Sequence, residues 1–168
     1  MESALAVANY FIQKSEETGY ELTPMKVIKL VYIAHGWHLG LLKKPLIEEE
    51  VQAWQYGPVI ETVYHAFKRF GASRIEGPAD TGNFFKSNIP QVEDSQVKGL
   101  LDSVWKAYGK FSGTQLSALT HQPNTPWDIV WNHPSYRNLF NIIPNDLIQE
   151  HYEQIINARR EHSSSPAA

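Results

Sequence analysis

The chain has 168 residues, enough for one domain that buries roughly 70% of the surface of its unfolded form. Its formal net charge of −3 is opposite to that of a strongly basic nucleic-acid-binding protein, and its lack of cysteine excludes disulfides, thiol nucleophiles and cysteine-type zinc sites. No apolar run is long enough to span a membrane and the N-terminus lacks a signal-peptide pattern, so we expect a cytoplasmic protein without membrane contacts.

The first predicted helix covers residues 3–18, where apolar side chains recur at helical spacing. Ser3 can cap its start, and Gly19 can end it in a left-handed conformation. A second helix is predicted over residues 23–42, because Thr23 is a good N-cap and a proline occupies the first helical position after it.

Residues 23–42 are apolar on nearly every side of this second predicted helix. Lys26 and Lys29 form its only charged face before Lys43. A helix that is apolar on most sides lies in the middle of a fold. We therefore expect it to be the central helix.

A short strand is predicted over residues 51–56, where two sets of side chains alternate along the chain. Gly57 breaks this strand, and Pro58 fits the first turn of a helix that continues to about Phe70. Such a short strand needs partners, so we expect a small sheet at this point of the fold.

Trp54 and Tyr56 point to the same side if this strand forms. Aromatic residues in such a place either fill the core or form an anchoring surface for a partner. Tyr64 and Arg69 on the following predicted helix would extend that surface. Both interpretations stay open for Trp54 and Tyr56.

Residues 72–92 show little regular pattern, although residues 74–76 would suit one more short strand. A loop of this length is either mobile or functional. Phe84 and Phe85 form an apolar pair inside it, so we expect them to be buried or used in binding.

Four more helices are predicted in the second half of the chain. They begin near residue 94, at the capping box of residues 112–115, at Thr125 and at Pro144. The whole pattern indicates a mainly α, compact single-domain bundle of about six to seven helices with a small β element near residues 51–56.

Patterns typical of catalysis or of metal binding are weak. His35 and His38 lie three residues apart, as two metal ligands would, but no His-Glu-x-x-His context surrounds them, and a buried histidine more often bonds to a nearby protein group. The run Glu48–Glu50 suits a solvated edge better than a catalytic pair of carboxylates. There is neither a Gly-x-Ser-x-Gly elbow nor a phosphate loop. We therefore expect no enzyme activity, no cofactor and no metal.

DNA binding by the chain alone is also not expected. Residues 112–133 allow two short helices around a turn, as in a helix-turn-helix. The second of them would present Trp127 and Asp128 at its start instead of the Arg, Asn or Gln side chains that read base edges.

Motifs in both halves of the chain point to one known family. They are Lys29–Leu39, Pro45–Leu46, Glu50, Ala53–Val59 and Val63–Tyr64 in the first half, and Leu100–Leu101, Val104–Trp105, Tyr108–Gly109, Leu116–Ser117, Leu119–His121, Pro126–Trp127 and Ile143–Pro144 in the second. These residues resemble the Panacea domain, also called the SocA-like antitoxin domain, of bacterial and often phage-associated toxin–antitoxin systems. The likeness covers roughly residues 5–156, so we expect a Panacea domain over residues 1–157 and a flexible tail over residues 158–168.

The resemblance implies an antitoxin that neutralises a cognate protein toxin by direct protein–protein binding. Toxins neutralised in this family include translation-inhibiting proteins related to small alarmone synthetases. One branch of the family acts instead as an adaptor that delivers its toxin to an ATP-dependent protease, and this alternative stays open. A metal-assisted hydrolase that uses His35 and His38 is the alternative outside the family, and homo-oligomerisation is also left open.

Two groups of residues carry these expectations. The candidate toxin-binding residues, chosen for aromatic clustering and exposure inferred from helical phase, are Trp54, Tyr56, Tyr64, Arg69, Phe84 and Phe85. The residues that we assign to the structural motif are Tyr32, His35, Gly57, Pro58, Trp105 and Trp127.

Overall fold

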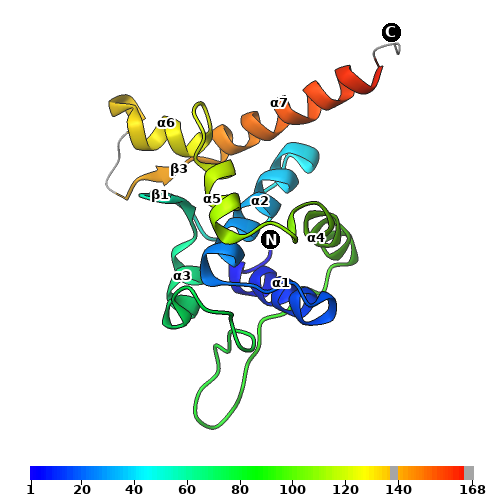
Figure 1. The fold of residues 1–168 in the computed structure, drawn as a ribbon, viewed down its shortest axis with the longest axis vertical. Helices are drawn as coiled ribbons and strands as arrows, with labels where there is room; N and C mark the ends of the chain where they lie inside the picture. The colour runs from blue at the N-terminus through cyan, green and yellow to red at the C-terminus, as the bar shows by residue number, and fades with distance from the viewer. Residues whose placement is uncertain (137–139, 165–168) are drawn as a thin grey trace.

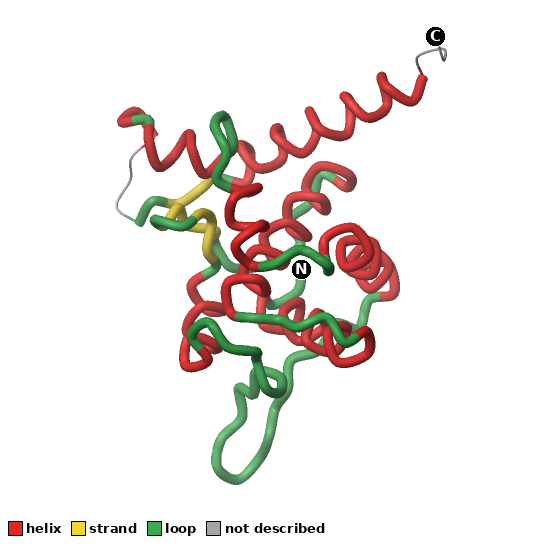
Figure 2. Tube along the Cα trace, viewed as in Figure 1, coloured by secondary structure: helices red, strands yellow, loops and turns green. Residues whose placement is uncertain are grey.

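The computed structural model describes residues 1–136 and 140–164. These residues form seven α-helices, two short 3₁₀ helices and three strands (Figures 1 and 2). In chain order they are α1 (Ala4–Thr18), α2 (Pro24–Leu42), β1 (Val51–Trp54), β2 (Gly57–Val59), α3 (Glu61–Phe67), η1 (Lys68–Phe70), α4 (Ser95–Tyr108), α5 (Gly113–Thr120), α6 (Pro126–Asn132), η2 (Pro134–Tyr136), β3 (Ile142–Ile143) and α7 (Asn145–Ser164). The expected mainly α, single-domain fold with a small β element is confirmed.

Helix α2 is the centre of the molecule, as the sequence predicted. It packs against α1, α4, α5 and α7, and Figure 1 shows these helices arranged around it. Its start is fixed by Thr23, whose side chain accepts a hydrogen bond from the backbone N–H of Lys26, and by Pro24 in the first turn. Because helices surround it, most of its side chains lie in the core.

Two glycines of α2 let α7 approach closely. A Cβ atom added at Gly36 would lie 2.1 Å from the ring of Tyr152, and one added at Gly40 would lie 2.8 Å from the Cβ of that tyrosine. The ring of Tyr152 also meets Trp37 edge-on, with 5.4 Å between the centroids. The long C-terminal helix is therefore held against the central helix by one aromatic side chain over two glycines.

The small sheet has the order β2-β1-β3, and both pairs of strands are antiparallel. Strands β1 and β2 form a hairpin in which Gln52 faces Val59 and Trp54 faces Gly57. The expectation that Pro58 opens a helix was wrong. Pro58 belongs to β2, an edge strand where a residue without a backbone N–H is tolerated, and the next helix starts at Glu61.

Other boundaries also differ from the expected ones. Residues 74–76 form no strand, although the N–H of Ile75 donates to the carbonyl of Leu22 and its side chain is buried. The last helix continues to Ser164, past the expected domain end at residue 157, and residues 165–168 of the expected tail lie outside the described residues. No helix in the described part of the chain has the length and apolar character needed to cross a membrane.

Candidate partner-binding groove

The β1–β2 hairpin is fixed to the helices around it through its backbone carbonyls. The indole N–H of Trp127 on α6 donates to the carbonyl of Trp54 at 2.6 Å. The hydroxyl of Ser117 on α5 donates to the carbonyl of Tyr56, also at 2.6 Å. Since backbone atoms carry these bonds, the side chains of Trp54 and Tyr56 stay available for other contacts.

A third hairpin carbonyl is bound by a buried lysine. The Nζ atom of Lys29, a residue only 2% exposed, donates to the carbonyl of Pro58 at 2.9 Å. A Cβ atom at Gly57 would lie 3.0 Å from this Nζ atom, and Gly57 has a φ of +113°, so both space and backbone conformation favour glycine. Burial lowers the pKa of Lys29 to about 7.

Lys26 is buried as well, so the expected charged face of the central helix does not exist. Its Nζ atom donates to the carbonyls of Glu21 and Gly109, and it lies 5.3 Å from the ring centroid of Trp105. Burial lowers its pKa too. Both lysines bond to backbone oxygens from the inside of the fold, which helical phase alone could not predict.

Beside the hairpin lies a groove with a volume of about 470 Å³. It runs between the start of α2, the hairpin turn and the end of the α3–η1 segment. Its lining residues are Pro24, Met25, Ile28, Lys29, Trp54, Gln55, Tyr56, Val59, Tyr64, Lys68 and Gly71. We call it the aromatic groove, because three of the six candidate binding residues meet there.

These three aromatic residues have different environments. Trp54 and Tyr64 pack edge to face, with their ring centroids 4.9 Å apart and an angle of 67° between the rings. The indole N–H of Trp54 donates to the side-chain oxygen of Gln52 at 2.8 Å. Tyr56 is 61% exposed. Trp54 and Tyr64 therefore form a fixed wall, and Tyr56 is the aromatic residue that is free to meet another molecule.

Arg69 is close to the aromatic groove in sequence but does not line it. Its guanidinium lies 4.4 Å from the ring centroid of Phe70 and donates to the carbonyl of Ala66 at 2.6 Å. The exposed positive charge on the groove comes instead from the neighbouring Lys68. Sequence reasoning also missed Met25, because a residue in the first turn of a central helix gives no sign that its side chain lines a surface groove.

Phe84 and Phe85 are not brought together with the other candidate residues. They lie in the long loop between η1 and α4, which projects from the helical body at the bottom of Figures 1 and 2. They are 97% and 92% exposed, and neither lines the aromatic groove. Five of the six candidate binding residues thus lie at two separate places, three at the aromatic groove and two on the long loop, while Arg69 belongs to neither.

His35 connects three segments inside the fold. Its Nδ1 atom accepts the N–H of Leu46 at 3.2 Å, so its Nε2 atom carries the proton and donates to the side-chain oxygen of Asn145 at 2.9 Å. Burial lowers the pKa of His35, which favours this neutral form. Both ring nitrogens are therefore used in bonds to the protein.

His38 makes a separate contact, since its Nδ1 atom lies 2.5 Å from the carbonyl oxygen of Lys44. Nowhere in residues 1–136 and 140–164 do three or more His, Asp or Glu side chains come together as metal ligands would. His35 and His38 each bond to protein groups in this structure.

The other residues assigned to the structural motif lie in the core. Tyr32 meets the ring of Tyr152 edge-on, with 6.4 Å between the centroids. Trp105 stacks on Phe11, and its indole N–H donates to the hydroxyl of Thr18. The contacts of Tyr32 join α2 to α7, and those of Trp105 join α4 to α1.

Comparison with known proteins identifies the family. Residues 27–128, which include most of α2, the hairpin and the long loop, match the model of the antitoxin SocA-like Panacea domain. The antitoxin SocA of Caulobacter vibrioides (strain NA1000 / CB15N) is 30% identical over 134 residues, which cover 78% of this chain and 71% of that protein. No solved structure matches the chain. The chain therefore belongs to the family of SocA-like Panacea-domain antitoxins.

Proposed function

We propose that this protein is an antitoxin that neutralises a cognate protein toxin by binding it directly, without catalysis of its own. Membership of the SocA-like family supports the general role. The observation that carries the proposal is the aromatic groove, whose walls are held by bonds to the hairpin backbone while the Tyr56 ring faces solvent. Exposed aromatic residues on a rigid support are typical of binding hot spots.

The groove also suggests what kind of toxin segment binds. Its floor and walls are mostly apolar and aromatic, and Lys68 supplies a positive charge at its edge, with Arg69 close by in sequence. An apolar side chain followed by an acidic one would match both features. A stable complex buries about 800 Å² on each partner, so the toxin must contact surfaces beyond the groove as well.

The buried ionisable groups support binding over catalysis. The amine of Lys29 and both ring nitrogens of His35 are engaged in bonds that hold the fold. Within this proposal, a translation-inhibiting toxin related to small alarmone synthetases is the first candidate, because the family is known to neutralise such toxins. The complex would act in the cytoplasm, where translation takes place.

The test is co-expression with the product of the neighbouring open reading frame, since toxins of this family are usually encoded beside their antitoxins. We expect growth to be rescued by the wild-type chain and binding to be measurable by calorimetry. Tyr56→Ala should weaken binding by about 10- to 100-fold, because it removes an exposed aromatic contact and leaves the backbone bond to Ser117 intact.

Tyr20→Ala is the matched control, because it removes another exposed tyrosine that does not line the groove. Affinity unchanged by Tyr56→Ala would contradict the groove as the binding site, whereas a wild-type chain that neither binds nor rescues would contradict the antitoxin role. The lifetime of the toxin in the same cultures separates occlusion, which leaves it unchanged, from delivery to a protease, which shortens it.

A further inference from the structure

We propose that residues 79–90 form a recognition arm whose tip, Phe84 and Phe85, enters an apolar cleft of the toxin. This inference rests on the proposed antitoxin function and adds a second contact, separate from the aromatic groove. The arm is built by three sets of hydrogen bonds, at its base, along its length and at its tip.

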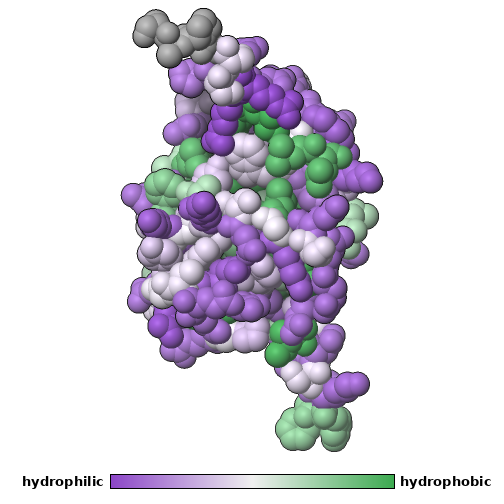
Figure 3. Space-filling view, turned by 90° about the vertical axis from the view of Figure 1, so that its right-hand side faces the viewer, coloured by the Kyte–Doolittle hydropathy of each residue, from purple (hydrophilic) through white to green (hydrophobic). Residues whose placement is uncertain are grey.

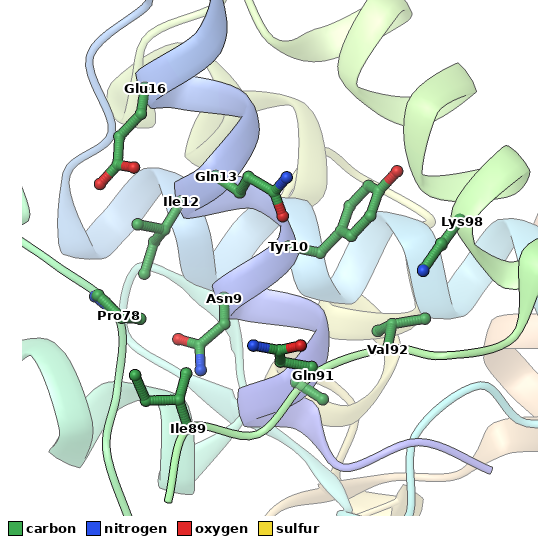
Figure 4. A pocket seen from close by; sticks show the side chains of 11 residues that line it. Asn9, Tyr10, Ile12, Gln13, Glu16, Pro78, Ile89, Gln91, Val92 and Lys98 are labelled. Carbon is green, nitrogen blue, oxygen red and sulfur yellow. The ribbon is translucent and has the colours of Figure 1, made fainter. Parts of the chain in front are cut away.

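The base of the arm is clamped to α1 by one buried side chain. The amide nitrogen of Asn9 donates to the carbonyls of Ala79 and Pro90, both at 3.0 Å, and its amide oxygen accepts the N–H of Ala79 at 2.7 Å. Figure 4 shows the Asn9 amide between the two loop segments that carry Pro78 and Gln91. Both ends of the arm are thus fixed to the helical body at one point.

The middle of the arm is ordered by Asp80. Its carboxylate accepts the N–H groups of Gly82 and Asn88 and the hydroxyl of Ser87, and these bonds lower the pKa of Asp80. Across the arm, the N–H of Thr81 donates to the carbonyl of Asn88 at 2.8 Å. The two sides of the arm are therefore paired, although neither is a regular strand.

The tip is a tight turn that displays both rings. The side-chain oxygen of Asn83 accepts the N–H of Phe85 at 2.9 Å and that of Lys86 at 3.0 Å, as in an Asx turn. The rings of Phe84 and Phe85 lie nearly at right angles, with centroids 5.5 Å apart. Figure 3 shows the tip as an apolar knob that stands away from the body.

This arrangement is unusual for a monomer, which rarely leaves large apolar side chains together on its surface. Because the turn is already ordered, the arm loses little conformational freedom when it binds. Each phenylalanine can bury 150–250 Å² of surface in a partner. Two buried rings on a pre-organised turn would form a hot spot.

The charge of the arm favours a protein cleft over a membrane. The arm itself, residues 79–90, carries one acidic residue, Asp80, and one basic residue, Lys86, and the segments that flank it, residues 74–78 and 91–94, add three acidic residues against one basic residue. An anionic membrane surface attracts basic segments and repels acidic ones. An arm without net charge, between acidic flanking segments, gains nothing from such a surface, so the partner that fits it is a protein with an apolar cleft.

The experiment uses the full-length chain and the purified toxin from the neighbouring gene. The double variant Phe84→Ser, Phe85→Ser should weaken binding by about 100-fold or more, while its melting temperature stays that of the wild type because both rings lie outside the core. Leu42→Ser, which removes an exposed apolar side chain at the end of α2, should bind like the wild type.

A second pair of variants tests the turn itself. Asn83→Ala removes the oxygen that orders the tip, whereas Asn83→Asp keeps an oxygen in the same place. We expect Asn83→Ala to bind the toxin about 10-fold more weakly than the wild type and Asn83→Asp to keep most of the wild-type affinity. Both variants still contain Phe84 and Phe85.

Four outcomes would contradict the proposed recognition arm. Toxin binding by the double phenylalanine variant at wild-type affinity would leave the antitoxin role intact and reject the arm alone. Phenylalanine-dependent binding to phosphatidylglycerol vesicles would assign the tip to a membrane, and a phenylalanine-dependent dimer in sedimentation would assign it to a second copy of this chain. If the wild type does not bind the toxin, the proposed antitoxin function is wrong, and the proposed role of the arm is wrong as well.

Discussion

At the scale of single residues, Lys29 is the most consequential position in the chain. An amine in the core is stable there only if it is bonded or neutral, since burial penalises its charged form. Here its amine donates to the carbonyl of Pro58, and burial lowers its pKa to about 7. It therefore links the conformation of the hairpin to proton binding.

The linkage has a definite sign. The folded-state pKa of Lys29, about 7, lies below the ordinary lysine value near 10.4, so between these values the unfolded chain binds more protons than the folded one. The free energy of unfolding should then rise with pH above about 7. From pH 7 to pH 9 the contribution of Lys29 is on the order of 2 kcal/mol.

Lys29→Met isolates this contribution, because it keeps the length of the side chain and removes the titration. Urea unfolding of the wild type and of Lys29→Met at pH 7, 8 and 9 gives the difference between their free energies of unfolding. Because both proteins contain Lys26, the titration of Lys26 cancels in this difference. We expect the wild type to gain about 2 kcal/mol relative to Lys29→Met over this range. Parallel pH profiles would show that Lys29 does not titrate there.

Sequence reasoning failed at this residue for a physical reason. Lysine is rarely fully buried, so two lysines on an apolar helix were expected to face solvent. Only the tertiary structure shows that free carbonyls of a hairpin and of a loop come within reach of each amine. The error at Pro58 has the same cause, because tertiary contacts decide its conformation. Pairing with β1 and the hydrogen bond from Lys29 to its carbonyl hold Pro58 in a strand.

At the scale of elements, the pairing of α2 with α7 depends on glycine. Gly36 sits against the Tyr152 ring, where a methyl group has no room. Gly99 in α4 has no atom within 4 Å of the place where its Cβ would be. The two positions therefore form a matched pair for the same substitution.

Gly36→Ala and Gly99→Ala should have opposite effects. Gly36→Ala forces Tyr152 or the whole of α7 to move and should cost about 1–3 kcal/mol, as overpacking does. Gly99→Ala should stabilise the protein by about 0.5–1 kcal/mol through helix propensity. Thermal or urea unfolding measures both changes, and an equal gain in stability from each would contradict the close packing of α2 and α7.

Elements were predictable where the sequence carries local signals. The caps at Ser3, Thr23, Ser112 and Thr125 all bond as their patterns indicated. The aromatic groove was predictable only in part, because strand alternation grouped Trp54 with Tyr56 but nothing local placed Met25 beside them. The order of the Phe84–Phe85 loop was not predictable either, since it depends on Asn9, which is distant in sequence.

At the scale of the whole molecule, a compact helical body carries two projecting parts. One is the recognition arm, and the other is the end of α7, which extends away from the body in Figure 1. Ile156 is the last buried residue of α7. Beyond it, Arg159 lies 4.9 Å from the ring centroid of Trp37, a contact of the kind worth about 0.5–1 kcal/mol at an exposed site.

The folded unit should therefore end near residue 157, even though the helix does not. A chain truncated after residue 157 keeps every buried contact of α7, including the Tyr152 ring over Gly36. We expect its free energy of unfolding to fall by about 1 kcal/mol or less and its affinity for the toxin to stay unchanged, because neither the groove nor the arm contains a residue of α7.

A second truncation, after residue 150, is the informative contrast. It removes Tyr152 and Ile156 from the core, so the interface between α2 and α7 loses the side chains that fill it. This shorter chain should unfold at a much lower temperature or fail to fold, as large losses of buried apolar side chains imply. Similar melting temperatures for the two truncated chains would show that α7 is dispensable for the fold.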